Sequence, residues 1–115
     1  VEVKRKEKGW EGRLRYEIVI QSPAMADLDL LRAHDRVAIL DRIEEILTVH
    51  PALESKSRIK RLREIESPQY RMRVGDYRVL YNVNEDDSRV HVIRILPKDR
   101  VLGYLKGIGY EPRQS

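Results

Sequence analysis

Three arginines stand at alternating positions around a tight turn in the middle of the chain. Arg71 and Arg73 precede Gly75–Asp76, and Arg78 follows it, within Gln69–Val83 (QYRMRVGDYRVLYNV). Alternation on both sides of two residues that tolerate positive φ predicts a β-hairpin. A two-residue turn places Arg73 opposite Arg78, and opposed like charges destabilise a hairpin by up to about 1 kcal/mol. We interpret this as an anion site, although a solvated outer sheet face explains the alternation equally well.

The same pairing sorts the hairpin side chains into two faces. Opposite residues in a ladder point the same way, so Arg71, Arg73 and Arg78 share one face. The other face carries the residues that we expect to be buried, namely Tyr70, Met72, Val74, Tyr77, Val79 and Tyr81.

The chain offers few competing sites for chemistry. It contains no cysteine, which excludes disulfides, thiolate catalysis and cysteine metal ligands. His34, His50 and His91 lack a partner at ligand spacing, so we expect no metal site and no cofactor. The basic face carries no pair of carboxylates, which argues against glycosidase and two-metal chemistry.

An arginine face with neither metal nor evident nucleophile suits cleavage of RNA, which supplies its own nucleophile, the 2′-hydroxyl. Arginines can hold the scissile phosphate and stabilise the negative charge of the transition state. A Tyr, Lys or His can donate a proton to the leaving 5′-oxygen. Because its pKa is above about 12, arginine is a poor base, so such a site would act mainly through electrostatics and positioning.

The charge distribution also favours a polyanionic partner. Net charge is +4, but residues 22–50 carry six acids against three arginines, whereas residues 51–83 carry eight bases against four acids. Such a basic surface favours nucleic acid, although small domains are often mildly basic without that partner. We assign to RNA binding the bases that precede the hairpin: Lys56, Arg58, Lys60, Arg61 and Arg63.

Length and composition indicate one globular domain. The chain has 115 residues and a hydrophobic content of 41%, enough for one modest core. No apolar run approaches the roughly 20 residues that span a bilayer, and no signal peptide is visible, so we expect a cytoplasmic protein without a membrane partner. We expect a flexible arm over residues 1–12, a domain over 13–106 and a flexible tail over 107–115.

Periodicity predicts the elements that position the hairpin. Leu14–Gln21 alternates as a strand does. One helix should begin at Ser22, and a longer one should be capped by Asp35; together they should form a helical hairpin that packs on a sheet. Residues 52–68 are interpreted as a basic connector, Arg89–Leu96 as a central strand, and Pro97–Lys106 as a turn and a short helix. The predicted fold is α+β, in the order β-α-α-β-β-β-α, with a four-stranded, mostly antiparallel sheet.

The chain resembles the RelE/ParE superfamily of bacterial and archaeal type II toxins. The likeness runs from about Leu14 to Tyr104, and its most specific part is YRMRVGDYRVLYNV at Tyr70–Val83, followed by VHVIRI and a basic turn. Toxins of the RelE branch similarly have a basic-x-basic strand, a Gly-containing turn and then Tyr-Arg-x-x-Tyr. KRLRE at Lys60–Glu64 and the helical hairpin also fit, and the family fold is a small α+β domain.

The resemblance implies ribosome-dependent cleavage of messenger RNA in the ribosomal A site. It also implies a cognate antitoxin that wraps the toxin and blocks or distorts the site. By position, Arg71 and Arg73 match the basic pair that contacts RNA, and in some family members this pair includes the general base. Arg78 matches the arginine that stabilises the transition state, and Lys98 stands where a further arginine is often found.

The C-terminal end departs from the family pattern His-Arg-x-x-Val-Tyr. Here Pro97–Tyr104 is PKDRVLGY, so an ungapped comparison puts Leu102 at the tyrosine position and a two-residue offset puts Tyr104 there. We take Tyr104 as the candidate proton donor or stacking residue. Two other functions stay open: a ParE-like toxin that binds DNA gyrase, and a catalytically weak RelE-fold protein that only binds its antitoxin.

Overall fold

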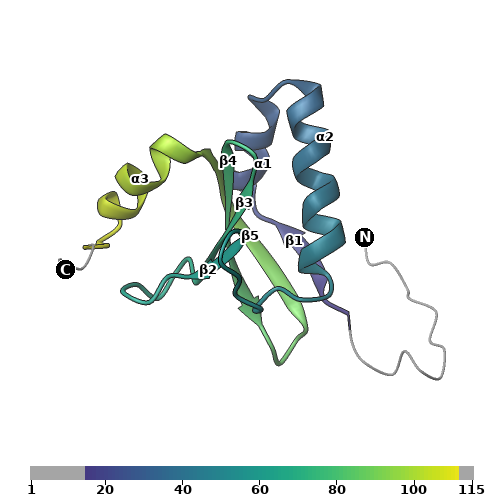
Figure 1. The fold of residues 1–115 in the computed structure, drawn as a ribbon, viewed down its shortest axis with the longest axis vertical. Coiled ribbons are helices and arrows are strands. Elements are labelled where there is room, and N and C mark those ends of the chain that lie inside the picture. Colours follow the sequence, from purple (N-terminus) through teal and green to yellow (C-terminus); the bar gives the residue numbers. More distant parts are fainter. Residues whose placement is uncertain (1–14, 112–115) are drawn as a thin grey trace.

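The computed structural model describes residues 15–111 as an α+β domain built on one mixed sheet (Figure 1). The sheet has five strands in the order β1-β5-β4-β3-β2; β1 is parallel to β5, and the other neighbours are antiparallel. The elements are β1 Glu17–Ile20, α1 Ser22–Asp29, α2 Ala33–Arg42 with a π-helical turn Ile43–Leu47, β2 Ile59–Arg61, β3 Tyr70–Val74, β4 Tyr77–Asn84, β5 Arg89–Pro97 and, after a 3₁₀ turn Lys98–Arg100, α3 Val101–Gly107.

The sheet has one strand more than predicted, because β2 lies inside the segment interpreted as a connector. This strand has only three residues, and Ile59 alone among them is buried. Pairing with β3 defines it, with Ile59 opposite Met72 and Arg61 opposite Tyr70. So short a segment carries no alternation pattern of its own, which is why its sequence did not indicate a strand.

The two predicted helices lie side by side on one face of the sheet (Figure 1). As predicted, α1 begins at Ser22; the capping position is Gln21, whose side chain makes no capping bond. The second helix begins at Ala33, so the predicted cap at Asp35 is wrong. Asp35 instead lies in the first turn, where its Oδ2 accepts a hydrogen bond of 3.1 Å from the Tyr77 hydroxyl and ties α2 to β4.

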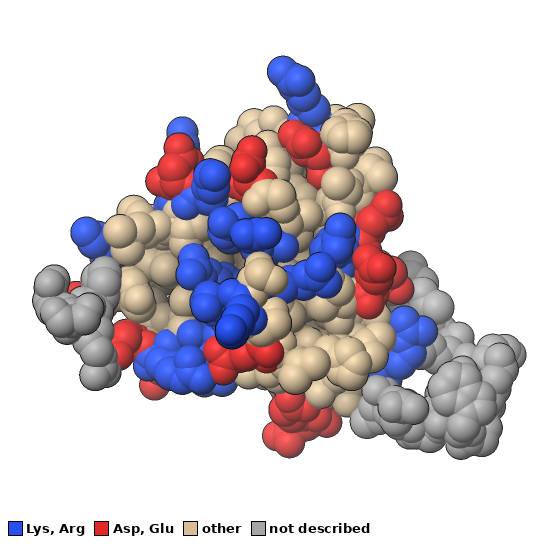
Figure 2. All heavy atoms as spheres, in the orientation of Figure 1, with Lys and Arg blue, Asp and Glu red and all other residues tan. Residues whose placement is uncertain are grey.

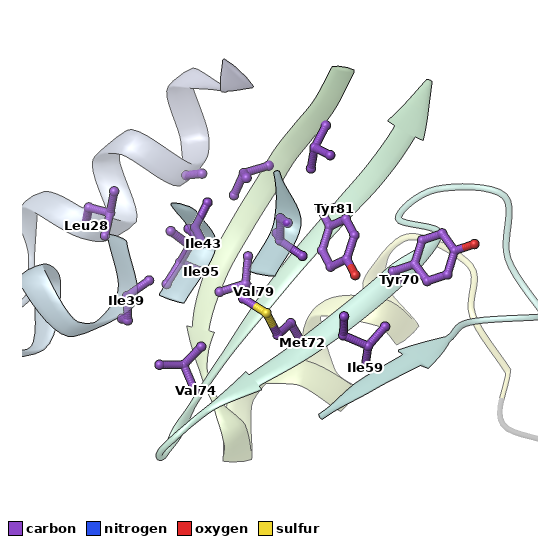
Figure 3. Close-up of a cluster of buried hydrophobic side chains, with 14 residues drawn as sticks. Leu28, Ile39, Ile43, Ile59, Tyr70, Met72, Val74, Val79, Tyr81 and Ile95 are labelled. Atoms are coloured by element: carbon purple, nitrogen blue, oxygen red, sulfur yellow. The ribbon is translucent and has the colours of Figure 1, made fainter. Parts of the chain in front are cut away.

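The main core fills the space between these helices and the sheet (Figure 3). It contains the hairpin face that was predicted to be buried, with Met72, Val79 and Tyr81 all at 0% exposure. The rings of Tyr70 and Tyr81 stack at a centroid distance of 5.4 Å. The Tyr81 hydroxyl donates a 2.6 Å hydrogen bond to the Pro51 carbonyl, so this buried polar group is satisfied.

A second, smaller core lies on the opposite face, beneath α3 (Figure 1). Its buried members are Leu62, Leu80, Leu96, Val101 and Leu105. Tyr110 also packs against it and donates its N–H to the Leu105 carbonyl at 2.9 Å. The predicted arm over 1–12 and the end of the predicted tail lie outside the described residues. Within residues 15–111, no helix is long and apolar enough to cross a membrane.

Candidate functional site

The hairpin has the register that the sequence predicted. Val74 pairs with Tyr77, and Arg73 pairs with Arg78. Gly75 occupies the turn with φ of +58°, a conformation that glycine adopts without steric strain. The arginine side chains therefore project from the face opposite the main core, as expected from the alternation.

These arginines line one open pocket of about 200 Å³. Its lining consists of Arg71, Arg73 and Arg78 with Lys56, Ser57, Arg58 and Lys60, so every charged lining residue is basic. Figure 2 shows Lys and Arg side chains gathered in the middle of the molecule, where the hairpin strands lie in Figure 1. We call this lining set the basic pocket.

Strand β2 supplies one wall of the basic pocket. Lys60 lies opposite Arg71 in the β2–β3 ladder, and the Arg73 N–H donates to the Arg58 carbonyl at 2.8 Å. Bases from the predicted connector are thus held beside the hairpin by backbone pairing. The sequence identified the residue types of this wall but missed the strand that brings them to the arginines.

Arg78 is the most constrained cation of the pocket. Its Nη1 donates to the carbonyls of Gly75 and Tyr77, at 3.1 and 2.9 Å. Burial, followed by repulsion from Arg71 and Arg73, lowers the pKa of Arg78 below its ordinary value. The cluster therefore holds positive charge at a cost, and an anion in the pocket would relieve that repulsion.

Two members of the predicted RNA-binding set, Arg61 and Arg63, lie apart from the basic pocket. Arg61 lies over the Tyr70 ring, with its guanidinium carbon 5.1 Å from the centroid, and Arg63 forms a 2.6 Å ion pair with Glu54. These residues line a separate hollow. Lys56, Arg58 and Lys60 thus join the arginines, whereas Arg61 and Arg63 do not.

Neither of the two C-terminal candidates lines the basic pocket. Lys98 sits at the hairpin turn, where its Nζ is 3.6 Å from Asp76 Oδ1 and its N–H donates to the Asp76 carbonyl at 2.7 Å. Tyr104 lines a second pocket of about 430 Å³ with Leu96, Gly103 and charged neighbours, Arg94, Asp99 and Arg100. Leu102, the alternative to Tyr104, is 47% exposed.

An ion pair that was not predicted joins α1 to β5. Arg94 Nε and Nη2 donate to Asp27 Oδ2 and Oδ1, at 2.7 and 2.9 Å, and the Ile95 N–H also donates to Oδ2, at 2.8 Å. The carboxylate of Asp27, and to a lesser extent Tyr104, raises the pKa of Arg94. The sequence around Arg94 shows only an arginine among the apolar residues in the second half of β5. Its partner Asp27 is 67 residues away in the chain. Among residues 15–111, no group of three or more His, Asp or Glu side chains could hold a metal ion.

Solved structures of toxins share this fold. A chain of the RelBE2 toxin–antitoxin complex from Mycobacterium tuberculosis matches with a TM-score of 0.64 and 23% identity, over 73% of this chain and 99% of that one. A chain of the archaeal RelE–RelB complex from Pyrococcus horikoshii gives 0.62 and 28%, over 76% and 99%. A free RelE mutant from Escherichia coli gives 0.63 and 20%, over 83% and 96%. The fold is that of the RelE toxins, as the resemblance predicted.

A family model for the ParE toxin of type II toxin–antitoxin systems, parDE, matches residues 18–102. The match spans most of the chain, which therefore belongs to this family, within the RelE/ParE superfamily. The protein is a toxin of a toxin–antitoxin system, in agreement with the sequence prediction. No curated protein sequence matches it significantly.

Proposed function

We propose that this toxin is a metal-independent endoribonuclease that cleaves messenger RNA in the ribosomal A site. The observation that carries the proposal is the basic pocket, in which Arg71, Arg73 and Arg78 converge with three more bases on one sheet face. Such a site binds a phosphodiester through charge-assisted hydrogen bonds. The 2′-hydroxyl of the RNA then gives its proton to water and attacks the adjacent phosphorus, and the bond to the 5′-oxygen breaks to leave a 2′,3′-cyclic phosphate.

Each arginine has a distinct task in this proposal. Arg71 and Arg73 hold the phosphate groups, because both side chains project from β3 into the basic pocket. Arg78 stabilises the extra negative charge of the transition state, and its two bonds to turn carbonyls support this role by fixing the guanidinium in advance. Lys98 and Tyr104 are the candidates for protonating the leaving oxygen.

The bases that precede the hairpin in the chain extend the same basic surface. Lys56, Arg58 and Lys60 would follow the RNA backbone away from the scissile phosphate, and Arg61 and Arg63 would contact it farther along. A cognate antitoxin and a cytoplasmic location belong to the proposal. The solved relatives from M. tuberculosis and P. horikoshii are themselves toxin–antitoxin complexes, which supports such a partner.

The second candidate is a toxin that binds DNA gyrase. It is favoured by the family model, which is named for ParE rather than RelE. This function would not require the arginine cluster, so the two candidates differ in their dependence on that cluster.

Induced expression of the wild type, Arg73→Ala and Arg78→Ala separates the candidates. We expect wild-type expression to create new 5′ ends in translated messages and both variants to lose them. Arg42→Ala is the matched control, because Arg42 lies on α2 across the sheet and is 3.9 Å from Glu45. Intact messages with gyrase-linked DNA breaks would instead support the second candidate, and full cleavage by both arginine variants would refute the proposed mechanism.

A further inference from the structure

Asp27 clamps the side chain of Arg94 from outside both pockets. It accepts two parallel hydrogen bonds from the guanidinium and a third from the Ile95 N–H. The exposed fractions of the Arg94 and Asp27 side chains are 28% and 11%, so the pair is largely shielded from water. A bidentate, shielded pair fixes both the place and the plane of the guanidinium.

The clamped guanidinium lies over an aromatic ring. The carbon at its centre lies 5.0 Å from the centroid of the Tyr104 ring. This is within the range of a cation–π contact, which strengthens when the cation is shielded from water. Asp27, Arg94 and Tyr104 thus form a continuous chain of contacts from α1, past the end of β1, to α3.

This chain of contacts ends close to the basic pocket. Arg78 lies opposite Leu96 in the β4–β5 ladder, and Leu80 lies opposite Arg94. Opposed residues point to the same face, so the Arg94–Tyr104 contact stands on the arginine face, one strand from Arg78. Leu96, the ladder partner of Arg78, also lines the pocket of Tyr104.

We propose that Asp27 and Arg94 are positioning residues, which set the orientation of Tyr104 beside the arginine cluster. The effect of this orientation on RNA cleavage rests on the proposed function. The second core holds α3 on the sheet, and the Tyr104 ring packs against that core on one side. The guanidinium of Arg94, fixed by Asp27, contacts the same ring and adds a charged, planar neighbour that apolar packing cannot supply. Asp27 would therefore affect the reaction without touching RNA.

The orientation of Tyr104 can be measured without any cleavage assay. The protein is labelled with 3-fluorotyrosine, and Tyr104→Phe assigns the fluorine resonance. We expect Asp27→Asn and Arg94→Lys to shift and broaden this resonance while the protein stays folded. The control is Arg89→Gln, which breaks a 2.9 Å ion pair with Glu17 elsewhere on β5. An unchanged Tyr104 resonance in both folded variants would overturn the proposal.

Single-turnover cleavage on programmed ribosomes tests the consequence for the reaction. We expect the rate at saturating ribosomes to fall roughly 10- to 100-fold in Asp27→Asn, the loss that a misplacement of about 1 Å can cause. The ribosome concentration for half-maximal rate should not change, because the basic pocket is intact. A shifted resonance with a wild-type rate would refute the link to the reaction. If the wild type cleaves nothing, the proposed function fails, and the resonance alone decides whether Asp27 and Arg94 position Tyr104.

Discussion

Arg73 lies directly opposite Arg78 in the β3–β4 ladder, and both side chains line the basic pocket. Cross-strand neighbours have Cβ atoms about 5 Å apart, so two cations at this position repel each other. Burial, and after it repulsion from Arg71 and Arg73, lowers the pKa of Arg78. Stability of the hairpin therefore depends on its other face, where Met72 and Val79 are fully buried. This arrangement favours a state in which an anion lies between the arginines.

Replacing Arg73 by glutamate should stabilise the free protein and, under the proposed function, abolish RNA cleavage. The change turns a cross-strand repulsion into an attraction, and such pairs contribute about 0.2–1 kcal/mol each. The midpoint of urea unfolding should therefore rise with the slope unchanged. Arg73→Gln is the matched intermediate, because it removes the repulsion without adding an attraction. An order of stability other than Glu above Gln above Arg would contradict this account of the pair.

The basic pocket should make RNA binding steeply dependent on salt. Six bases line it, and each phosphate contact to a single strand contributes about −0.7 to the slope of log K against log salt, so we expect a slope near −4. Arg78→Ala should make the slope shallower by about 0.7. Arg63→Ala should alter it less, because Arg63 is already paired with Glu54. Equal changes in the two variants would mean that binding is not centred on the pocket. Fluorescence titration of a short labelled RNA measures both slopes.

The hairpin was predictable because its signals agree. Strict alternation, a turn with glycine and strands of five and eight residues fix the register, and the register alone determines which face carries the arginines. Strand β2 was not predictable in this way. It has three residues, and only its pairing with β3 defines it. The start of α2 was misplaced because a polar residue in the first turn looks like a cap, whereas Asp35 bonds to Tyr77.

The sequence grouped the candidate site residues correctly only where they are close together in the chain. Arg71, Arg73 and Arg78 lie on one hairpin, so alternation was enough to group them. The bases before the hairpin were taken as one set, yet backbone pairing brings Lys60 to the arginines, while Glu54 and Tyr70 hold Arg63 and Arg61 apart. Contacts between distant segments, such as Asp27 with Arg94, leave no periodic trace in a single sequence.

Helix α3 should detach when its apolar anchor is shortened. Leu105 is 3% exposed, and truncating a buried leucine to alanine costs about 2–5 kcal/mol. We expect Leu105→Ala to increase amide hydrogen exchange in α3 more than in β3 and β4. Leu102→Ala is the control on the same helix, because its side chain is 47% exposed. If both variants exchange alike, the second core does not hold α3.

Alkaline pH should destabilise the protein, largely through Tyr81. Burial, with a smaller effect of Tyr70, raises the pKa of Tyr81 above its ordinary value of 10.0, and hydrogen bonds to Glu85 and Asp35 raise the pKa values of Tyr16 and Tyr77. Above about pH 10 the unfolded chain loses phenolic protons that the folded chain keeps, so stability is complete below this pH and falls as pH rises. Each fully retained proton corresponds to about 1.4 kcal/mol per pH unit.

Tyr81→Phe separates this effect from the rest of the alkaline unfolding. The variant should lose about 1–3 kcal/mol at neutral pH, because the buried Pro51 carbonyl is left without the donor that it has at 2.6 Å. Its stability should nevertheless fall less steeply than that of the wild type above about pH 10. Phenylalanine has no phenolic proton for the folded chain to retain. Tyr16→Phe, at a more exposed tyrosine bonded to Glu85, should change the slope less. Urea unfolding at a series of pH values measures both quantities, and a slope in Tyr81→Phe equal to the wild-type slope would show that Tyr81 is not responsible.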